Sequence, residues 1–167
     1  MKILIFTEGT IIMHKNAVGH TREEIVIQVE MKESSIHDYT SYVPVKNAST
    51  KIKGWHDQGA EILYLTSRQK PYEIEQIKQV LIKHDFPIGR IEHRVVEETY
   101  KDIAERIMPD VLIEDDCESI GGKDQMTITH VSSDKKAKIK SIPLKEFGGI
   151  DHLPDNLAKL LRYSGTD

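Results

Sequence analysis

The chain has 167 residues, which is a usual size for one domain and is enough to bury a substantial core. Acidic residues outnumber basic ones 27 to 23 and the two signs are interspersed, so we predict no nucleic-acid partner. Cys117 is the lone cysteine, which excludes an internal disulfide, and no apolar run approaches the length of a membrane span; both observations favour a soluble, cytoplasmic protein without membrane contact.

The first predicted elements are strands. The apolar run Ile3-Leu4-Ile5 predicts a buried strand, and the period-two pattern of apolar side chains from Glu24 to Met31 predicts another. Together with residues 10–13 and a turn that ends at Gly19, this second strand predicts a β-hairpin flap over about residues 11–34. Such a short insert leaves no room for a large cap domain.

Strands and helices then alternate along the chain. We predict helices over residues 49–58, 71–84, 99–108 and 157–161, and strands over residues 61–65, 91–96, 111–113 and 127–131. This alternation favours an α/β fold of three layers, Rossmann-like, with a central parallel sheet between helices. We expect residues 1–167 to form one domain.

The segment Phe6-Thr7-Glu8-Gly9-Thr10 directly follows the first strand and places an acidic Gly-Thr turn at its end. It resembles the first motif, Asp-x-Asp-Gly-Thr, of the haloacid dehalogenase (HAD) superfamily. Counting back from Gly9-Thr10 puts Glu8 at the second aspartate and Phe6 at the first, which is the nucleophile of the family's phosphatases. A second alignment, with two residues deleted, also leaves no aspartate there. Both alignments remove the carboxylate that attacks phosphorus.

Three further segments resemble the remaining HAD motifs in order, so that the resemblance spans about residues 1–131. They are Thr66-Ser67 after the strand over residues 61–65, Lys101 in a polar segment before the apolar positions Ile103, Ala104 and Ile107, and Glu114-Asp115-Asp116 after the strand over residues 111–113. The resemblance implies that Thr66, Ser67 and Lys101 bind a phosphoryl group. It also implies that Mg²⁺ is held by Asp115, with Glu114 or Asp116 as a substitute, and by the backbone carbonyl of Glu8.

Each motif residue also has a structural interpretation. Thr66 and Ser67 are typical of a helix cap, Lys101 of a solvated surface, and Glu8 of a turn carboxylate as well as of a general acid and base. Three adjacent carboxylates repel one another unless they are solvated, placed at a helix N-terminus or shared with a cation. Because parallel strands end at one edge of the sheet, we expect the motif residues to converge on one pocket.

Magnesium binding is expected to be weak without a phosphate ligand, because Phe6 removes one charged ligand of the family's metal site. The eight histidines include His14 and His20 in the predicted flap. No histidine pair shows the spacing of a helical zinc site, so surface or core positions are favoured for them.

Two main functions compete. The first is a HAD-like protein that lacks the nucleophile and serves as a binding or regulatory module for a small phosphorylated molecule at Thr66, Ser67 and Lys101. The alternative is a magnesium-dependent phosphohydrolase, phosphatase-like or nucleotidase-like, that acts on a small phosphomonoester by an unusual route, with Glu8 activating water. A third hypothesis is a subunit whose protein partner completes the site; the sequence does not identify such a partner.

Overall fold

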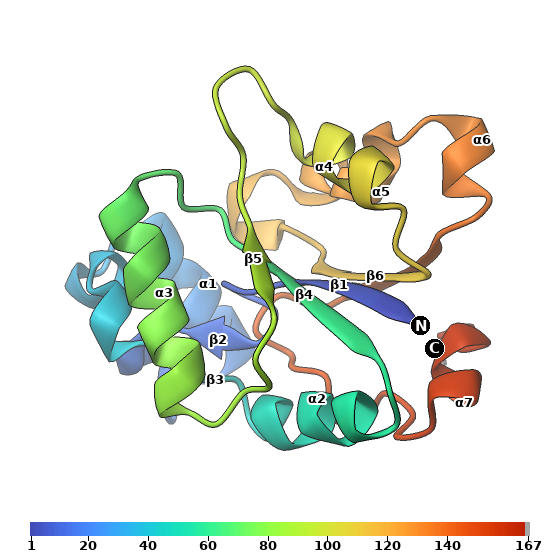
Figure 1. Ribbon diagram of the computed structural model, residues 1–167. Coiled ribbons are helices and arrows are strands. Elements are labelled where there is room, and N and C mark those ends of the chain that lie inside the picture. The colour runs from blue at the N-terminus through green and yellow to red at the C-terminus, as the bar shows by residue number, and fades with distance from the viewer. Residues whose placement is uncertain (166–167) are drawn as a thin grey trace.

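The computed structural model describes residues 1–165 and shows a parallel sheet between two layers of helices (Figure 1). In sheet order the strands are β5 (Arg90–Glu92), β4 (Glu61–Leu65), β1 (Lys2–Phe6), β6 (Val111–Asp115) and β7 (Lys140–Leu144). Each neighbouring pair of strands is parallel. The predicted three-layer α/β fold is therefore confirmed.

Helices cover both faces of the sheet. One face packs against α2 (Ala48–Asp57), α3 (Pro71–Lys83) and α7 (Leu157–Leu161), and the other against α4 (Tyr100–Ile107) and α5 (Thr127–His130), with α6 (Ser133–Lys136) beyond (Figure 1). Four of the predicted helices, α2, α3, α4 and α7, lie within about two residues of their expected bounds, since propensity and capping locate ends only that well. No helix among residues 1–165 is long and apolar enough to cross a membrane.

The central strand β1 is buried from both faces. Ile3 and Ile5 pack in one cluster with Trp55 of α2, whereas Leu4 packs in the opposite cluster with Ile103 of α4. Successive side chains of a strand point to opposite faces, so a strand that is covered on both sides reads as a continuous apolar run. The same alternation carries on to Phe6, which packs toward α4.

The strand predicted from Glu24 to Met31 is wrong: this segment is helix α1 (Arg22–Glu30). A capping box begins the helix, in which the Thr21 hydroxyl accepts from the Glu24 amide (3.3 Å) and the Glu24 carboxylate accepts from the Thr21 amide (2.8 Å). The period-two face is not the buried face, because Ile27 and Met31 are 56% and 77% exposed. The local cap decides the structure here.

The predicted hairpin flap over residues 11–34 is only partly correct. A two-stranded antiparallel sheet does leave β1, but it pairs β2 (Ile12–Met13) with β3 (Val43–Pro44). Its second strand therefore lies beyond the predicted insert. Between the two strands are α1 and the short 3₁₀ turns Lys15–Ala17, Ser34–His37 and Tyr39–Ser41. No cap domain occurs within the part of the chain that the structure describes.

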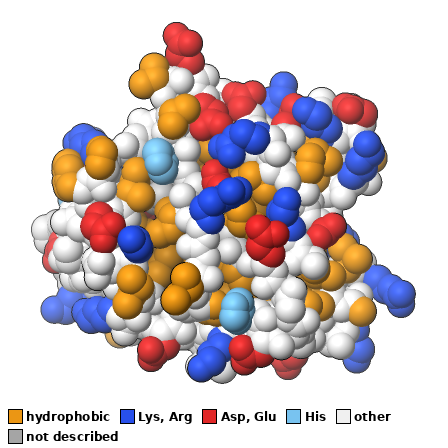
Figure 2. Space-filling model, in the orientation of Figure 1, with side chains coloured by type: hydrophobic (Ala, Val, Ile, Leu, Met, Phe, Trp, Pro, Cys, Tyr) orange, Lys and Arg blue, Asp and Glu red, His pale blue; other side chains and the backbone are white. Residues whose placement is uncertain are grey.

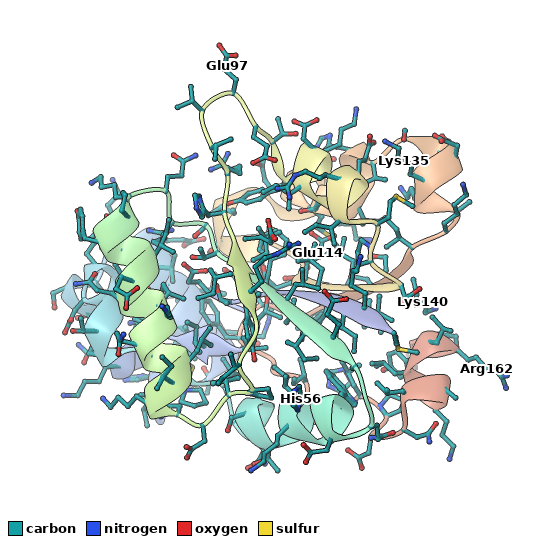
Figure 3. All side chains as sticks on the ribbon, in the orientation of Figure 1. His56, Glu97, Glu114, Lys135, Lys140 and Arg162 are labelled. Atoms are coloured by element: carbon teal, nitrogen blue, oxygen red, sulfur yellow. The ribbon has the colours of Figure 1, made fainter. Side chains whose placement is uncertain are left out.

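The last predicted strand, over residues 127–131, is also wrong, because this segment is helix α5. The sheet is instead completed by β7, which the sequence analysis does not predict. Pro143 interrupts its pattern and has no amide to donate, which a strand tolerates at the edge of a sheet, where β7 lies. At the opposite edge, β5 is shorter than the predicted strand over residues 91–96, and Glu97 lies at the tip of the loop that follows it (Figure 3).

Candidate functional site

A cavity of about 780 Å³ lies at the carboxyl ends of the central strands. Its wall includes Glu8 after β1, Ser67 after β4, Lys101 in α4 and Asp115 at the end of β6. These residues are far apart in the sequence, and the parallel sheet brings them to one edge. The structure thus places all four segments that resemble HAD motifs around a single cavity.

The position that aligns with the family's nucleophile in the sequence resemblance holds an aromatic ring. Phe6 lines the cavity, and its ring meets that of Tyr100 edge to face, with centroids 5.1 Å apart and planes 73° apart. This geometry is favourable for an aromatic pair. A phenyl ring has no lone pair to attack phosphorus, so this position can bind but cannot form a phosphoenzyme.

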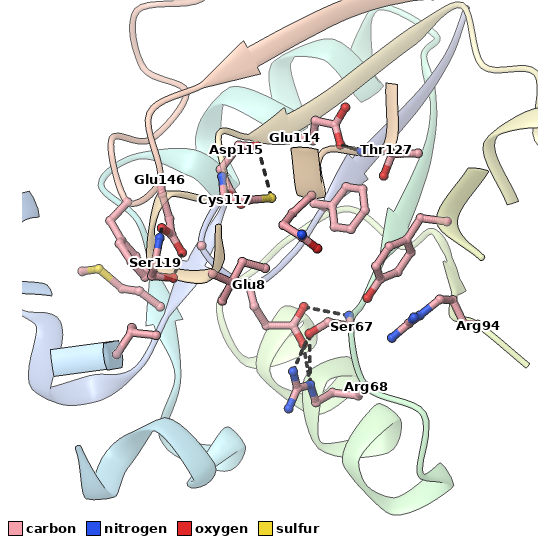
Figure 4. Close-up of a pocket in the computed structure, with 18 of the residues that line it drawn as sticks. Glu8, Ser67, Arg68, Arg94, Glu114, Asp115, Cys117, Ser119, Thr127 and Glu146 are labelled. Carbon is pink, nitrogen blue, oxygen red and sulfur yellow. Dashed lines mark hydrogen bonds and ion pairs between the residues drawn. The ribbon is translucent and has the colours of Figure 1, made fainter. Parts of the chain in front are cut away.

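The carboxylate of Glu8 is held by groups from β4 and the loop after it (Figure 4). It accepts hydrogen bonds from the Thr66 hydroxyl (2.7 Å) and the Ser67 amide (3.3 Å), and Arg68 Nε lies 3.2 Å from Oε1. The Thr7 hydroxyl also contacts it. Only 14% of the Glu8 side chain is exposed. These donors therefore suit a negatively charged oxygen, and the Glu8 carboxylate supplies it.

These donors are held in place by the ends of the strands. The amide of Thr66 donates to Glu92 O (3.0 Å), and the Thr7 amide donates to Leu65 O (2.9 Å). Arg68 lies over the ring of Tyr39, with its guanidinium carbon 4.8 Å from the ring centroid. Thr66 and Ser67 are not the cap of α3, which begins at Pro71.

The three adjacent carboxylates at the end of β6 do not converge on one point. Glu114 accepts from the amides of Thr127 (2.7 Å) and Ile128 (3.0 Å) at the start of α5. Asp115 accepts from the Thr10 hydroxyl and from the Cys117 amide, each at 2.9 Å. Asp116 accepts from the Glu146 amide at 3.0 Å. Because neighbouring residues of a strand point to opposite faces, each carboxylate has its own partners.

These hydrogen bonds of the three carboxylates bear directly on the predicted magnesium site. Within residues 1–165, no group of three or more His, Cys, Asp or Glu side chains is arranged to hold a metal ion. The oxygens of Asp115 already have protein donors, so the residues present do not fit a tightly held Mg²⁺. Weak magnesium binding that depends on a phosphate ligand stays a prediction.

Burial governs the electrostatics of this acidic side of the cavity. Burial raises the pKa of Glu114, of Asp115 and of Glu146 above the ordinary carboxyl values, although hydrogen bonds to each of them act in the opposite direction. Gly9, with φ +81°, approaches this group so closely that a Cβ atom would lie 2.9 Å from Asp115 Oδ2. Only glycine fits at that turn without a shift.

One residue of the wall, Glu146, escapes sequence reasoning, whereas His14 is among the histidines for which surface or core positions are favoured. Glu146 is 7% exposed and accepts from both the amide (2.8 Å) and the hydroxyl (2.7 Å) of Ser119. It follows β7, whose pattern predicts no strand, so nothing in the sequence signals its place. His14 is 2% exposed and lines the cavity, with Nδ1 2.8 Å from Ser35 Oγ, and is thus a core histidine.

Lys101 lies at the outer part of the cavity. Its side chain is 41% exposed, and its ammonium group lies 3.9 Å from Glu105 Oε1, one turn further along α4. A lysine so placed is partly solvated, as the structural interpretation predicts, and still lines the cavity where it can meet an incoming anion.

The sheet is parallel, and the four segments that resemble HAD motifs lie at its carboxyl edge around one cavity. No family model matches the sequence, and no curated protein matches it.

Three solved structures are similar to this one. The HAD domain of the effector protein Lem4 from Legionella pneumophila has a TM-score of 0.48 at 15% identity and covers 87% of this chain and 86% of its own. The D,D-heptose 1,7-bisphosphate phosphatase of Burkholderia thailandensis has a TM-score of 0.42 at 11% identity, over 84% of this chain and 90% of its own. A universal stress protein in complex with cAMP has a TM-score of 0.36 at 11% identity, over 87% and 97%. At these identities the likeness concerns the fold alone.

Proposed function

We propose that the protein is a HAD-like module that binds a small phosphorylated molecule and does not hydrolyse it through a phosphoenzyme. One observation carries the proposal: Phe6 packs on Tyr100 at the nucleophile's position, while the donors beside it are already arranged around an oxyanion. A site that has lost its attacking carboxylate and kept donors for an oxyanion is suited to binding.

The Glu8 carboxylate is an internal occupant of the phosphoryl position. It takes up the Thr66 hydroxyl, the Ser67 amide and Arg68, which are donors of the kind that a phosphoryl group needs. In the bound state the phosphoryl oxygens replace Glu8 at these donors, and Lys101 adds its charge from the outer part of the cavity. Phosphate binding and withdrawal of Glu8 are therefore coupled.

The alternative, a magnesium-dependent phosphohydrolase in which Glu8 activates water, needs a carboxylate that is free to accept a proton from water. The two oxygens of Glu8 instead accept from a hydroxyl and an amide and lie beside a guanidinium. This arrangement favours a bound carboxylate over a general base, since a base must reach the proton that it abstracts.

The deciding experiment measures phosphate release from a panel of phosphomonoesters, with and without Mg²⁺, for the wild type and for Phe6→Asp. Phe6→Asn is the matched control, because it has the size of aspartate without the nucleophile. We expect a silent wild type and a silent Phe6→Asn, and magnesium-dependent turnover by Phe6→Asp. Calorimetry of the wild type with inorganic phosphate and ethyl phosphate should show binding.

Other results have definite meanings. Wild-type turnover that requires Mg²⁺ and is lost in Asp115→Asn would make the protein an enzyme with another nucleophile. A folded but silent Phe6→Asp would contradict the alignment of Phe6 with the nucleophile. A wild type that binds no phosphate as a monomer, and binds it only in a complex found by size-exclusion chromatography, would favour the hypothesis of a partner that completes the site.

A further inference from the structure

One cation of the cavity lacks a counter-charge. Among the basic residues of the wall, Arg68 pairs with Glu8 and Lys101 pairs with Glu105, whereas Arg94 forms no ion pair with any carboxylate of residues 1–165. Arg94 lies in the loop after β5, and its side chain points toward Ser67 (Figure 4). Its Nε atom is buried and has no hydrogen-bond partner.

An aromatic face holds this cation in place. The guanidinium carbon of Arg94 lies 4.3 Å from the centroid of the Tyr100 ring, which is close enough for a cation–π contact. Such a contact orients the guanidinium plane but does not neutralise its charge. The guanidinium thus lies beside the cavity without a counter-charge, and its fork of N–H donors is of the kind that matches phosphate or carboxylate oxygens.

The same tyrosine ring extends an aromatic wall into the cavity. Phe6 meets Tyr100 edge to face, and both line the cavity next to Arg94. The remaining lining is rich in apolar and aromatic side chains: Met13, Val29, Ile36, Tyr42, Ile120 and Phe147. A ligand that fills this space therefore needs an apolar or aromatic body as well as an anionic end.

We propose that Arg94 and the Phe6–Tyr100 pair form a subsite for aromatic phosphomonoesters. Arg94 contacts the phosphoryl oxygens together with Arg68, and the ring of the ligand packs on the Phe6–Tyr100 wall. The inference rests on the proposed function and deepens it by naming the class of ligand. It also gives Phe6 a role: the residue that removed catalysis is part of the surface that selects the ligand.

The test is calorimetric binding of phenyl phosphate, ethyl phosphate, inorganic phosphate and adenosine monophosphate to the wild type and to variants. Arg94→Gln should weaken the binding of every phosphate by about tenfold, because a charge-assisted bidentate contact is lost. Arg162→Gln is the matched control and should bind these phosphates as the wild type does. It removes an exposed arginine at the end of α7 (Figure 3). Arg94→Lys keeps the charge without the fork and should fall between them.

Phe6→Leu separates a specific subsite from a general loss of structure. It should weaken phenyl phosphate by about threefold while ethyl phosphate binds as before, because only the aromatic contact is removed. Urea denaturation of each variant shows whether it is folded. If adenosine monophosphate binds more tightly than phenyl phosphate, the aromatic ester is a nucleotide. The reverse order identifies a smaller aryl ester. Either order supports the subsite.

The outcomes distinguish the two proposals. If the wild type binds ethyl phosphate and neither Arg94→Gln nor Arg94→Lys changes its affinity, the subsite is refuted and the proposed function stands. If the wild type binds phenyl phosphate and ethyl phosphate with equal affinity, the aromatic wall is refuted and the proposed function stands. If the wild type binds no phosphate at all, both proposals fail.

Discussion

At the scale of single residues, Glu8 illustrates how a turn carboxylate can be held by the loop after a neighbouring strand. A glutamate after β1 reaches across to the Thr66 hydroxyl, the Ser67 amide and Arg68 in the neighbouring loop. The sequence predicts a carboxylate at this turn, and it leaves open whether the group is a general acid and base or a turn carboxylate. The contacts show a carboxylate that is held by the loop after β4, and they exist because β1 and β4 lie side by side.

Removal of this internal ligand should expose the donors. Glu8→Ala is expected to raise the affinity for inorganic phosphate about tenfold, since a competing set of charge-assisted hydrogen bonds is lost. Isothermal titration calorimetry measures the change. Glu8→Gln, which keeps the shape but not the charge, should give a smaller gain. A fall in affinity in Glu8→Ala would show that Glu8 assists phosphate binding instead of competing with it.

His14 makes the stability of the protein depend on pH. Burial lowers the pKa of His14 below its usual 6.5, although Glu33 acts to raise it. As the pH falls through 6.5 the unfolded chain takes up a proton before the native protein does, so the free energy of unfolding decreases. The contribution of neutral His14 to stability is fully present above this pH, and it is lost as the pH falls toward the lower pKa of His14 in the folded protein.

We therefore expect urea denaturation at pH 7.5 and pH 5.5 to show a larger loss of stability for the wild type than for His14→Asn. The difference should not exceed about 1.4 kcal/mol per pH unit, the limit for one proton. His20→Asn, which removes a half-exposed histidine beside Glu24, is the control and should behave as the wild type. An equal pH dependence of His14→Asn and the wild type would assign the effect to other groups.

At the scale of elements, local and long-range signals compete. Helix α1 carries a period-two pattern that predicts a strand, yet the Thr21–Glu24 capping box and the exposure of Ile27 show that the helix forms. Apolar alternation is informative only when one face is buried, and burial is a property of the tertiary structure. Strand β7 is not predicted, because Pro143 interrupts its sequence pattern. The strand forms because it pairs with the neighbouring strand β6.

The junction of β6 and α5 gives a prediction at this scale. Glu114→Gln should lower the free energy of unfolding by about 1–3 kcal/mol, because one of the two buried hydrogen bonds that the helix amides donate to the carboxylate is lost. Glu97→Gln, at the exposed tip of the loop after β5, is the control and should change stability by less than about 0.5 kcal/mol.

The same variant also tests the magnesium hypothesis. Because the Glu114 oxygens accept from Thr127 and Ile128, Glu114→Gln should leave phosphate affinity in the presence of Mg²⁺ unchanged. A loss of magnesium-dependent binding with unaltered stability would instead make Glu114 a metal ligand. Chemical denaturation and calorimetry on one preparation separate the two effects.

At the scale of the whole molecule, residues 150–161 close the core on the face of the sheet that α2 covers. The Trp55 indole donates to Pro154 O (2.9 Å) and the Lys51 ammonium to Leu153 O (2.7 Å), so α2 holds this segment in place. Leu160 of α7 is completely buried in the cluster that contains Ile3 and Trp55. On the visible face, charges of both signs are interspersed (Figure 2), so no single-sign field dominates there.

Leu160→Ala should lower the free energy of unfolding by about 2–5 kcal/mol, because it leaves a cavity in a packed core. The neighbouring Leu161 is 43% exposed, and Leu161→Ala should cost less than about 1 kcal/mol. Urea denaturation followed by circular dichroism measures both. Similar losses for the two variants would show that α7 is not part of the cooperative core.

The sequence by itself determined the parallel sheet between helices, and it places a phenyl ring instead of a carboxylate at Phe6. These properties depend on side-chain identity and on periodicity along the chain, which are local. Only the tertiary structure decided that Glu8 is held by Thr66, and that Glu114, Asp115 and Asp116 have separate partners in Thr127, Thr10 and Glu146. Each of these depends on contacts between segments that are distant in the chain, and such contacts exist only once the layers have packed.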